Sequence, residues 1–406
     1  MTDKLVPKLR FPDFSGDWVV KKLEELTKIN QGLQIPISDR FTEHVHNSYF
    51  YITNEFLKES SNNQYFIQNP PQSVICEEND ILMTRTGNTG QVVTNVNGVF
   101  HNNFFKIKYS DEIYKNFFVE FLRLISTQKL ILRYAGTSTI PDLNHGDFYR
   151  LTINLPNKQE QIKIADFLTS VDDKIQQLTK KKGLLEQYKK GVMQQIFSQQ
   201  LRFKDDCGND YPAWQEATLG NIGYTYNGLT GKNKDDFGNG KPYITYKQVF
   251  DSISIDKNRF DYVLIKPDEK QSIVKYGDAL FTTSSETPEE VGMSSLYLSE
   301  SNDDVYLNSF CFGYRFKHTK LLPMFACYLF RSSVFRCEVI NLAQGSTRYN
   351  ISKIQMMNII ISLACLEEQT KIANFLTSID DKITQVTALL TQTKQYKKSL
   401  LQQMFI

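Results

Sequence analysis

Residues 160–197 read EQIKIADFLTSVDDKIQQLTKKKGLLEQYKKGVMQQIF, and residues 368–405 read EQTKIANFLTSIDDKITQVTALLTQTKQYKKSLLQQMF. The two stretches align without a gap at a constant offset of 208 (368 minus 160), and 22 of the 38 positions are identical. A repeat of such a long period indicates two equivalent structural units. We therefore expect each unit to be a globular body followed by one long helix.

Apolar residues recur in both stretches at alternating spacings of three and four, which is the a/d pattern of a heptad. These residues are Ile164, Leu168, Val171, Ile175, Leu178, Leu185, Val192 and Ile196 in the first copy, and Ile372, Leu376, Ile379, Ile383, Val386, Leu390, Leu400 and Met404 in the second. We expect the two helices to pack on each other; the alternative is that each packs on its own body. Lys189 and Lys397 interrupt the pattern at the same place, either to set its register or to lie in solvent.

The helix boundaries and the bodies carry weaker signals. Asn157 and Glu160 resemble a capping box at the start of the first helix. Segments 48–53, 91–96, 151–155 and 357–363 read as strands, and 115–133 and 322–340 read as helices, so each body is mixed α and β.

Short anchors recur between the two bodies, while the residues between the anchors barely match. The pairs are Leu9-Arg10-Phe11 with Leu201-Arg202-Phe203, Trp18 with Trp214, Tyr51-Ile52-Thr53 with Tyr243-Ile244-Thr245, Asp80–Thr84 with Asp278–Thr282, Asn102-Asn103-Phe104 with Asn308-Ser309-Phe310, and Gly136-Thr137-Ser138 with Gly345-Ser346-Thr347. Two similar scaffolds with dissimilar surfaces suit a protein that reads two different things at a fixed separation.

Composition narrows the class of protein. The 406 residues are 41% hydrophobic and 23% charged, which is typical of a folded globular chain. The N-terminus has no signal-like apolar region, and no apolar run reaches the roughly 18 residues of a membrane span. The six cysteines form no CxxC motif, and His44 and His46 are the only close histidine pair. We expect a cytoplasmic protein with reduced thiols and no metal site.

The motif E-Q-x-K-I-A-x-F-L-[TS]-x-[VI]-D-D-K-I at 160–175 and 368–383, together with the run Gly-Ser-Thr-Arg-Tyr-Asn-Ile-Ser at 345–352, resembles the specificity subunits of type I restriction–modification systems. The resemblance implies an α+β chain in which two pseudo-repeated α/β target-recognition domains, 1–156 and 198–364, are joined by two long antiparallel coiled-coil helices, 157–197 and 365–406, that act as spacers.

The same resemblance implies function. The chain would be a non-catalytic subunit that recognises a bipartite, gapped site in double-stranded DNA. It would recruit two methyltransferase subunits and two motor-nuclease subunits, for adenine methylation or for cleavage of unmodified DNA. S-adenosylmethionine, ATP and Mg²⁺ are expected on those partners, and no cofactor on this chain.

Polar loops are the candidate DNA contacts, because arginine and asparagine suit guanine and adenine edges and glycines let backbone amides approach phosphates. The candidates are Arg85, Thr86, Asn88, Thr89, Thr137 and Ser138 in the first body, and Thr283, Ser284, Ser285, Ser346, Thr347, Arg348, Tyr349 and Asn350 in the second. The first body shows Ile140-Pro141-Asp142 near the place where the second has Arg348-Tyr349-Asn350. An ordinary hairpin turn is the alternative for the loop 84–90.

Two other functions compete with DNA recognition. The chain can be a coiled-coil adaptor whose bodies bind proteins, which the near-neutral net charge of +2 allows. It can also be a nuclease or methyltransferase in its own right. However, Asn69-Pro70-Pro71-Gln72 lacks the aromatic residue that stacks on a flipped base, and no complete catalytic motif is present.

Overall fold

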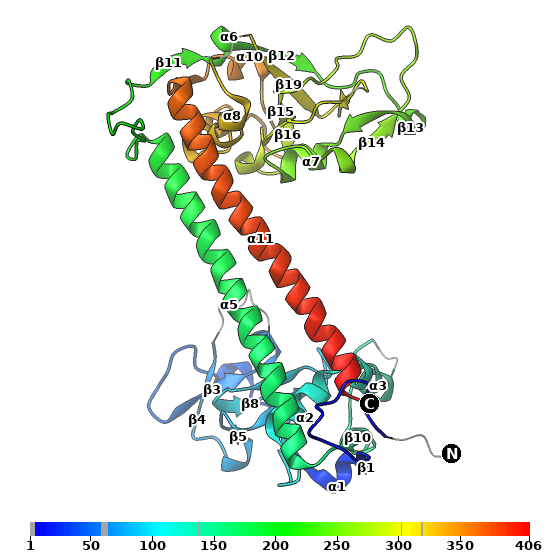
Figure 1. Cartoon of the computed structure of the whole chain (residues 1–406). Coiled ribbons are helices and arrows are strands. Elements are labelled where there is room, and N and C mark those ends of the chain that lie inside the picture. The colour runs from blue at the N-terminus through cyan, green and yellow to red at the C-terminus, as the bar shows by residue number, and fades with distance from the viewer. Residues whose placement is uncertain (1–4, 58–63, 137–138, 302, 318–319) are drawn as a thin grey trace. The chain divides into compact units, whose positions relative to one another are not determined.

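The computed structural model describes residues 5–57, 64–136, 139–301, 303–317 and 320–406. The chain divides into two compact units: unit 1 comprises Met1–Thr179 and Ala388–Ile406, and unit 2 comprises Lys180–Thr387. Both long helices, α5 (Lys158–Phe197) and α11 (Leu366–Met404), contribute to both units (Figure 1). Each unit therefore contains one body and a part of each long helix.

Unit 1 contains two four-stranded sheets and a two-stranded ribbon. The first sheet is antiparallel in the order β2-β9-β6-β7, with β2 (Thr27–Gln31), β6 (Ile81–Thr84), β7 (Val92–Thr94) and β9 (Phe104–Tyr109). The second has the order β4-β3-β8-β5, with β3 (Ser48–Ile52), β4 (Phe66–Gln68), β5 (Ile75–Cys76) and β8 (Gly98–Phe100). The ribbon pairs β1 (Val19–Lys22) with β10 (Thr152–Leu155).

The helices of the first body are short. They are α1 (Leu23–Leu26), α2 (Lys115–Arg123), α3 (Ile125–Ala135) and α4 (His145–Tyr149), with 3-10 turns η1 (Ile37–Asp39), η2 (Asn54–Leu57) and η3 (Gln72–Val74). The segment predicted as helical, 115–133, is two consecutive helices, because Leu124 between α2 and α3 leaves the helical conformation (φ −56°, ψ 139°). Its side chain is buried in the core, so packing sets the break.

Unit 2 repeats this plan. Its main sheet has the order β12-β19-β15-β17, with β12 (Gly223–Asn227), β15 (Ala279–Thr282), β17 (Ser294–Leu296) and β19 (Cys311–Phe316). A three-stranded sheet has the order β14-β13-β18, with β13 (Phe237–Ile244), β14 (Asp261–Val263) and β18 (Tyr306–Leu307). Two ribbons pair β11 (Gln215–Thr218) with β21 (Ile360–Leu363), and β16 (Ser284–Ser285) with β20 (Tyr349–Asn350).

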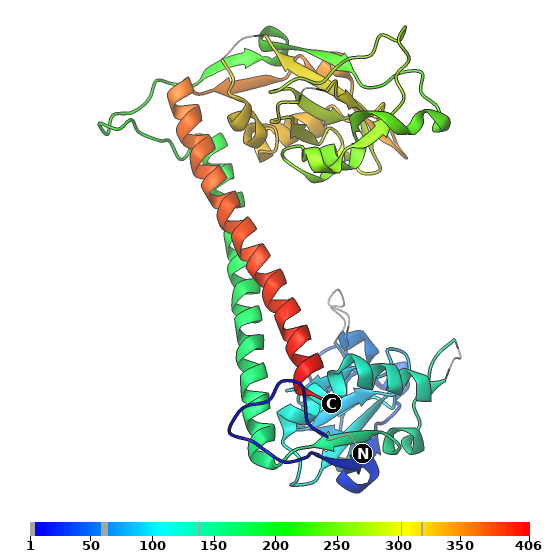
Figure 2. The same ribbon diagram turned by 45° about the vertical axis from the view of Figure 1, so that its right-hand side comes forward.

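The helices of the second body follow the same order along the chain. They are α6 (Leu219–Ile222), α7 (Tyr246–Asp251), α8 (Pro323–Leu329), α9 (Ser333–Asn341) and α10 (Lys353–Met356), with 3-10 turns η4 (Lys234–Asp236), η5 (Lys257–Arg259) and η6 (Pro288–Glu290). The helix predicted over 322–340 is again two helices. Ser332 caps α9 by accepting from Phe335 N. Within unit 2, the β11–β21 ribbon lies beside the start of α11 (Figure 2).

Strand pairing confirms that the two bodies are one fold repeated. Tyr51 and Ile52 in β3 pair in parallel with β8, and Tyr243 and Ile244 in β13 pair in parallel with β18. One sequence anchor was off by one residue. Phe104 pairs with Thr84 as Cys311 pairs with Thr282, so Phe104 corresponds to Cys311 and not to Phe310. Strand pairing sets this correspondence, and the Asn-x-Phe pattern that the two sequences share is displaced from it by one residue.

The central strands explain why the sequence anchors survive. Ile81 and Met83 point into one core of unit 1, whereas Leu82 between them points into another. Ala279 and Phe281, with Leu280 between them, divide in the same way in unit 2. Alternate residues of a strand face opposite sides of the sheet. Because both sides of these strands are covered by a core, their residues are apolar throughout.

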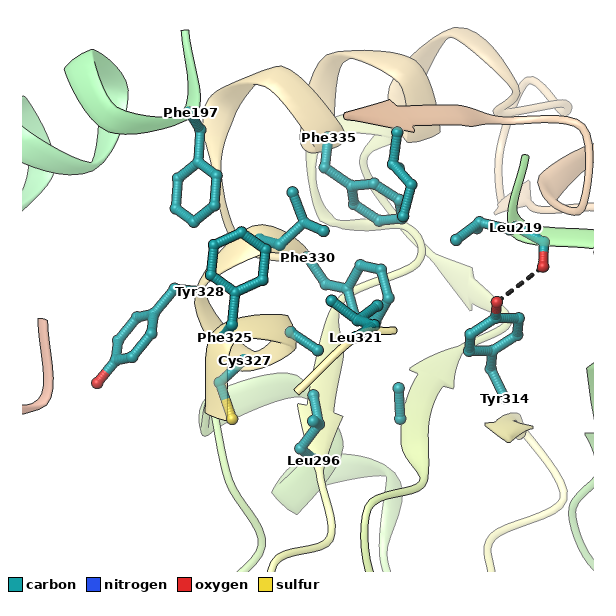
Figure 3. Close-up of a cluster of buried hydrophobic side chains, with 14 of the residues drawn as sticks. Phe197, Leu219, Leu296, Tyr314, Leu321, Phe325, Cys327, Tyr328, Phe330 and Phe335 are labelled. Carbon is teal, nitrogen blue, oxygen red and sulfur yellow. Dashed lines mark hydrogen bonds between the residues drawn. The ribbon is translucent and has the colours of Figure 1, made fainter. Parts of the chain in front are cut away.

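Aromatic rings fill the larger core of unit 2. Phe330 lies 4.8 Å from Phe335 between ring centroids, and Tyr314 donates its hydroxyl to Leu219 O at 2.8 Å (Figure 3). Phe197, at the end of α5, packs against Phe325 of α8. The end of the first long helix is thus part of the second body's core.

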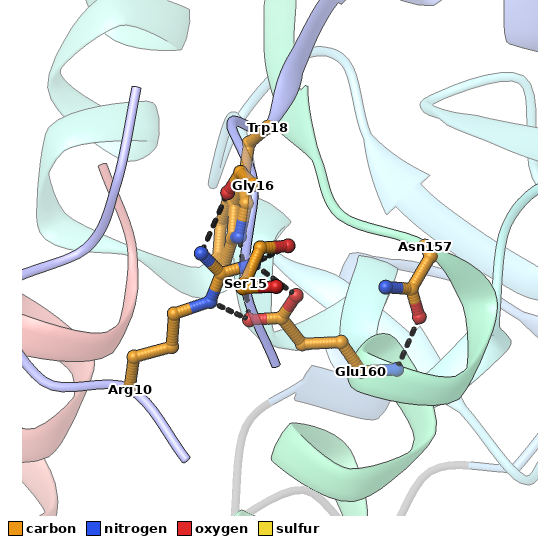
Figure 4. Close-up of polar contacts among 6 residues, drawn as sticks. All are labelled: Arg10, Ser15, Gly16, Trp18, Asn157 and Glu160. Atoms are coloured by element: carbon orange, nitrogen blue, oxygen red, sulfur yellow. Dashed lines mark hydrogen bonds and ion pairs between the residues drawn. The ribbon is translucent and has the colours of Figure 1, made fainter. Parts of the chain in front are cut away.

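The identical Glu-Gln pairs that open the repeats are structural. Glu160 is fully buried and accepts two hydrogen bonds from Arg10, at 2.7 and 2.8 Å, and one from Trp18 Nε1 at 3.3 Å (Figure 4). Glu368 accepts the same set from Arg202 and Trp214. Asn157 caps Glu160 N at 2.9 Å, but the Glu160 side chain turns to Arg10, so only half of the predicted capping box forms.

The apolar stripes of the long helices serve the cores of the units. In unit 1, Ile164, Leu168 and Val171 of α5 join a core that also contains Leu400 and Met404 of α11. In unit 2, the equivalent residues of α11 join a core with Val192 and Ile196 of α5. Each body therefore buries the beginning of one long helix and the end of the other, which combines the two packing alternatives that the sequence left open.

Candidate nucleic-acid interface

The loop after β6 in unit 1 is a closed turn. Thr84 Oγ1 accepts from Gln91 N at 2.9 Å, and Gly90 N donates to Thr84 O at 2.8 Å. Gly87 and Gly90 have φ angles of 84° and 92°, a region that glycine enters without strain. The hairpin alternative is therefore correct for the backbone, and the exposed side chains of the turn decide what it can bind.

Arg85 is the cation of this turn. Its Nη2 lies 2.7 Å from Asp142 Oδ2, and its guanidinium carbon lies 5.9 Å from the centroid of the Phe105 ring. Its Nε is buried and has no hydrogen-bond partner among the residues that the structure describes. The arginine thus lies over an aromatic ring, with its Nη2 paired to a carboxylate and its Nε donor unused.

The other predicted residues of the first body differ in accessibility. Asn88 is exposed, and Thr86 is half-buried and forms an isolated bridge with Asp142. Thr89 is buried and donates to Pro141 O at 2.7 Å and to Arg85 O at 3.1 Å, so it stabilises the loop. Thr137 and Ser138 lie outside the described residues.

In the second body, two of the predicted serines are not accessible. Ser284 and Ser285 are buried in β16, and Ser285 Oγ donates to Glu290 Oε2 at 3.1 Å. Thr283 is half-buried, and its backbone bridges Phe310 O and Ile351 N. Thr283, Ser284 and Ser285 therefore support the surface from beneath. The exposed side chains belong to the segment that pairs with them.

That segment is 346–350. Ser346, Thr347, Arg348 and Asn350 are exposed and Tyr349 is half-buried. Arg348 Nε donates to Ser284 Oγ at 3.2 Å, and its guanidinium lies 5.6 Å from the Phe310 ring centroid. Among the described residues, no carboxylate forms an ion pair with Arg348.

Arg348 lines a pocket of about 700 Å³ together with Thr347, Tyr246, Phe250 and Glu286. Tyr246 donates its hydroxyl to Ser284 O at 2.7 Å, and burial raises the pKa of this phenol, so the group remains a neutral donor. A concave surface with a free guanidinium, aromatic edges and an exposed carboxylate can discriminate donors from acceptors.

The two bodies build this surface on one common bridge. Leu143 N donates to Arg85 O at 2.8 Å in unit 1, and Ile351 N donates to Thr283 O at 3.0 Å in unit 2. Asp142 bridges Thr86 as Asn350 pairs with Ser284. The bridge joins 85–86 to 142–143 in the first body and 283–284 to 350–351 in the second. The first body therefore has its arginine, Arg85, in the earlier of the two segments, whereas Arg348 lies beside the later one.

The sequence did not single out Phe105 or the pairing of Asp142 with Arg85, and it gave Phe310 only as a repeated anchor and not as a ring beside Arg348. Asp142 could have been found from the sequence, because it lies 208 residues before Asn350. It therefore occupies the position in the first body that Asn350 occupies in the second. Asn144 and Ser352, which cap α4 and α10, differ by the same 208 residues.

Two other kinds of feature are absent from the described residues. No group of three or more histidine, cysteine, aspartate or glutamate side chains could hold a metal ion there. No helix in that part of the chain combines the length and hydropathy that a membrane crossing requires.

Comparison with known proteins gives the family. The model of the type I restriction modification DNA specificity domain matches residues 15–187 and 212–395. The MjaVIII type I restriction enzyme specificity subunit of Methanocaldococcus jannaschii is 24% identical over 409 residues, which covers 97% of this chain and 92% of that protein. The MjaIX specificity subunit of the same organism is 23% identical over 68% of each chain.

Two solved structures share the fold. The type I restriction–modification S subunit from M. genitalium has a TM-score of 0.59 at 16% identity and covers 99% of both chains. A structure described in terms of complex assembly of the type I R-M system has a TM-score of 0.56 at 17% identity, covering 95% of this chain and 96% of the other. Because the family model matches both halves, this chain belongs to the specificity subunits of type I restriction–modification systems, with one specificity domain in each half.

Proposed function

We propose that this specificity subunit reads a bipartite, gapped site in double-stranded DNA, with one half-site for each body. The observation that carries the proposal is the common bridge, which has an arginine over a phenylalanine ring in both units, Arg85 at 5.9 Å from the Phe105 centroid and Arg348 at 5.6 Å from the Phe310 centroid. The residues around the two arginines differ, so each body would read its own bases. The buried candidates Thr89, Ser284 and Ser285 would shape these surfaces without touching the DNA.

The long helices would form an antiparallel coiled coil that sets the spacing between half-sites. Support comes from contacts inside each unit. Lys397 of α11 pairs with Asp172 of α5 in unit 1, and Lys189 of α5 pairs with Asp380 of α11 in unit 2. In this division, 1–156 and 198–364 are the target-recognition domains, and 157–197 and 365–406 are the spacers.

The chain itself would be non-catalytic and act in the cytoplasm. It would recruit two methyltransferase subunits and two motor-nuclease subunits, which methylate adenine in each half-site or cleave unmodified DNA. S-adenosylmethionine, ATP and Mg²⁺ would be bound by those subunits. Two equivalent docking positions are supported by exposed residues that recur on the two long helices, Gln187, Tyr188 and Lys190 of α5 and Gln395, Tyr396 and Lys398 of α11.

Methylome sequencing tests the proposal directly. A host that expresses this chain with its methyltransferase subunit should methylate adenines in one gapped motif with two defined halves. A chimaera in which another specificity subunit's body replaces residues 201–364 should change one half of the motif and leave the other. Absence of any sequence-dependent methylation by an assembled complex would contradict DNA recognition and favour a protein-binding adaptor.

A further inference from the structure

Two pockets occupy equivalent places in the two units. In unit 1, a pocket of about 460 Å³ lies between the α2–α3 turn and the end of α11, and in unit 2 a pocket of about 520 Å³ lies between the α8–α9 turn and the end of α5. The linings share positions that differ by 208: Arg123 and Arg331, Leu124 and Ser332, Ile125 and Ser333, Lys398 and Lys190, Leu401 and Met193, and Gln402 and Gln194. We call these the α11-end pocket and the α5-end pocket.

The repeated arginine belongs to the frame of each pocket. Arg331 donates to Ser294 O at 2.7 Å and to Ser252 O at 2.8 Å, and burial lowers its pKa to about 10. Arg123 points to Val92 O at 3.4 Å. The Arg331 contacts tie the helix–helix turn of unit 2 to the neighbouring strand and loop, so Arg331 fixes the wall of its pocket. Among the described residues, Arg123 makes only the one long hydrogen bond across to β7, and its side chain stays 44% exposed.

The lysine and the floor of each pocket remain available. Lys190 and Lys398 are exposed, and neither has an ion pair within the described part of the chain. The side chains beneath them are apolar, Met193 in one pocket and Leu401 in the other. The two carboxylates in the lining of the α5-end pocket, Glu186 and Asp380, are ion-paired with Lys182 and Lys189. Ile125 beside Leu401 is 49% exposed. A cation next to an apolar depression fits an apolar side chain that has a carboxylate beside it.

The surface around the pockets is repeated as well. Tyr188 and Tyr396, one half-turn before the two lysines, have the same exposed fraction of 52%. The residues between the shared anchors of the two bodies barely match, and core packing does not require identical exposed side chains. Two copies of one surface on one chain match two copies of one partner.

We propose that each pocket docks an apolar side chain flanked by a carboxylate, supplied by one of two copies of the same protein partner. This inference rests on the proposed function, under which the partner is the methyltransferase subunit. Because each pocket is built from both a body and the end of a long helix, docking there would fix the partner against the body that reads the DNA. A nucleic-acid partner fits less well, since an apolar floor gains nothing from a phosphate.

Charge reversal with a matched control tests the pockets. We would purify the chain with its methyltransferase subunit and count bound copies by native mass spectrometry. Lys190→Glu and Lys398→Glu should each raise the dissociation constant of one site about tenfold or more, leaving one tightly bound copy, and the double variant should lose both. Lys174→Glu and Lys382→Glu, an equivalent exposed pair outside both pockets, should retain two copies.

The outcomes separate the pocket from the broader proposal. Two bound copies in the Lys190→Glu/Lys398→Glu double variant would overturn the pocket inference and leave recruitment intact. An equal loss in the Lys174→Glu/Lys382→Glu control would also overturn it, because general surface charge would then explain binding. Failure of the unaltered chain to bind any methyltransferase subunit would instead overturn recruitment itself. Unchanged melting temperatures of all variants show that the fold is retained.

Discussion

Lys189 Nζ lies 2.5 Å from Asp380 Oδ1, which joins the two long helices within unit 2. Lys397, 208 positions after Lys189, and Asp172, 208 positions before Asp380, form the reciprocal pair within unit 1 at 2.7 Å. The lysines that interrupt the heptad pattern are therefore matched to aspartates on the opposite helix. This contradicts the alternative in which both lysines are simply solvated.

Reversal of one charge in this pair should destabilise unit 2. The side chains of Lys189 and Asp380 are 17% and 27% exposed, so Lys189→Glu would place two partly desolvated carboxylates together and cost about 2 kcal/mol of unfolding free energy. Lys189→Glu with Asp380→Lys should recover most of the loss. Calorimetric unfolding measures both, and a double variant no more stable than Lys189→Glu would contradict the pairing.

Glu160 offers a larger effect in unit 1. Its carboxylate has 0% exposed surface and holds Arg10 and Trp18, so Glu160→Gln leaves the guanidinium without its counter-ion and should cost about 3 kcal/mol. Glu186→Gln is the control, because its carboxylate is 50% exposed and contacts Lys182 only as a surface pair. The methylated motif should be unchanged in both variants, since neither residue lies on the recognition surface. A Glu160→Gln loss below about 0.5 kcal/mol would show that the cluster is dispensable.

Removal of the Asp142 charge should strengthen DNA binding by the first body. Asp142→Asn reproduces the residue type that Asn350 has in the second body and releases Arg85 from its ion pair. A freed cation that reaches a phosphate makes the slope of log affinity against log salt more negative by about 1. Fluorescence anisotropy across a salt series measures this slope. Asp13→Asn, an exposed change of the same charge, controls for net charge, and an equal slope change there would refute the specific role.

Truncation of the two arginines should weaken DNA binding. Arg85→Ala and Arg348→Ala should each cost about 1–3 kcal/mol of affinity if the guanidinium contacts a base edge. Each should also relax the base preference in one half of the methylated motif. Unchanged affinity and an unchanged motif would remove that arginine from the interface. Arg150→Ala, which removes an exposed arginine of unit 1, provides the comparison for lost charge alone.

The sequence predicted the features that repeat with regular spacing. The long helices end within two residues of the predicted boundaries because heptad spacing is a local signal. The breaks at Leu124 and before Ser332 were missed, since no glycine or proline marks them and tertiary packing decides them. The same holds for Phe104 and Cys311, whose correspondence only strand pairing reveals.

The sequence indicates which residue types could form the candidate site, but not whether each side chain faces solvent or the protein interior. Threonine and serine in a polar loop look alike whether they face solvent or a carbonyl, and Thr89 and Ser285 turned out to be buried. Arg348 is exposed and Arg85 is half-buried, and the rings beside them, Phe310 and Phe105, come from other parts of the chain. Such pairings depend on the fold and have no signal in a single sequence. The contact of both arginines with DNA stays a prediction.

His101 should make unit 1 less stable in mild acid. Burial, with a smaller effect of the Arg40 charge, lowers the pKa of this imidazole below its ordinary value of 6.5, and its Nδ1 accepts a hydrogen bond from Asn103 N at 3.1 Å. Near pH 6.5 the His101 imidazole therefore binds a proton more readily in the unfolded chain than in the folded chain. Stability should fall as the pH drops through 6.5, until the pH passes below the folded-state pKa.

Substitution isolates this contribution from that of the carboxylates. His101→Gln keeps an acceptor near Asn103 N but cannot titrate, so its melting temperature should fall less than that of the unaltered chain between pH 7.5 and pH 5.5. His46→Gln, which removes an exposed histidine, should follow the unaltered chain. Parallel melting curves for His101→Gln and the unaltered protein would mean that the imidazole gains its proton equally well in the folded and unfolded states.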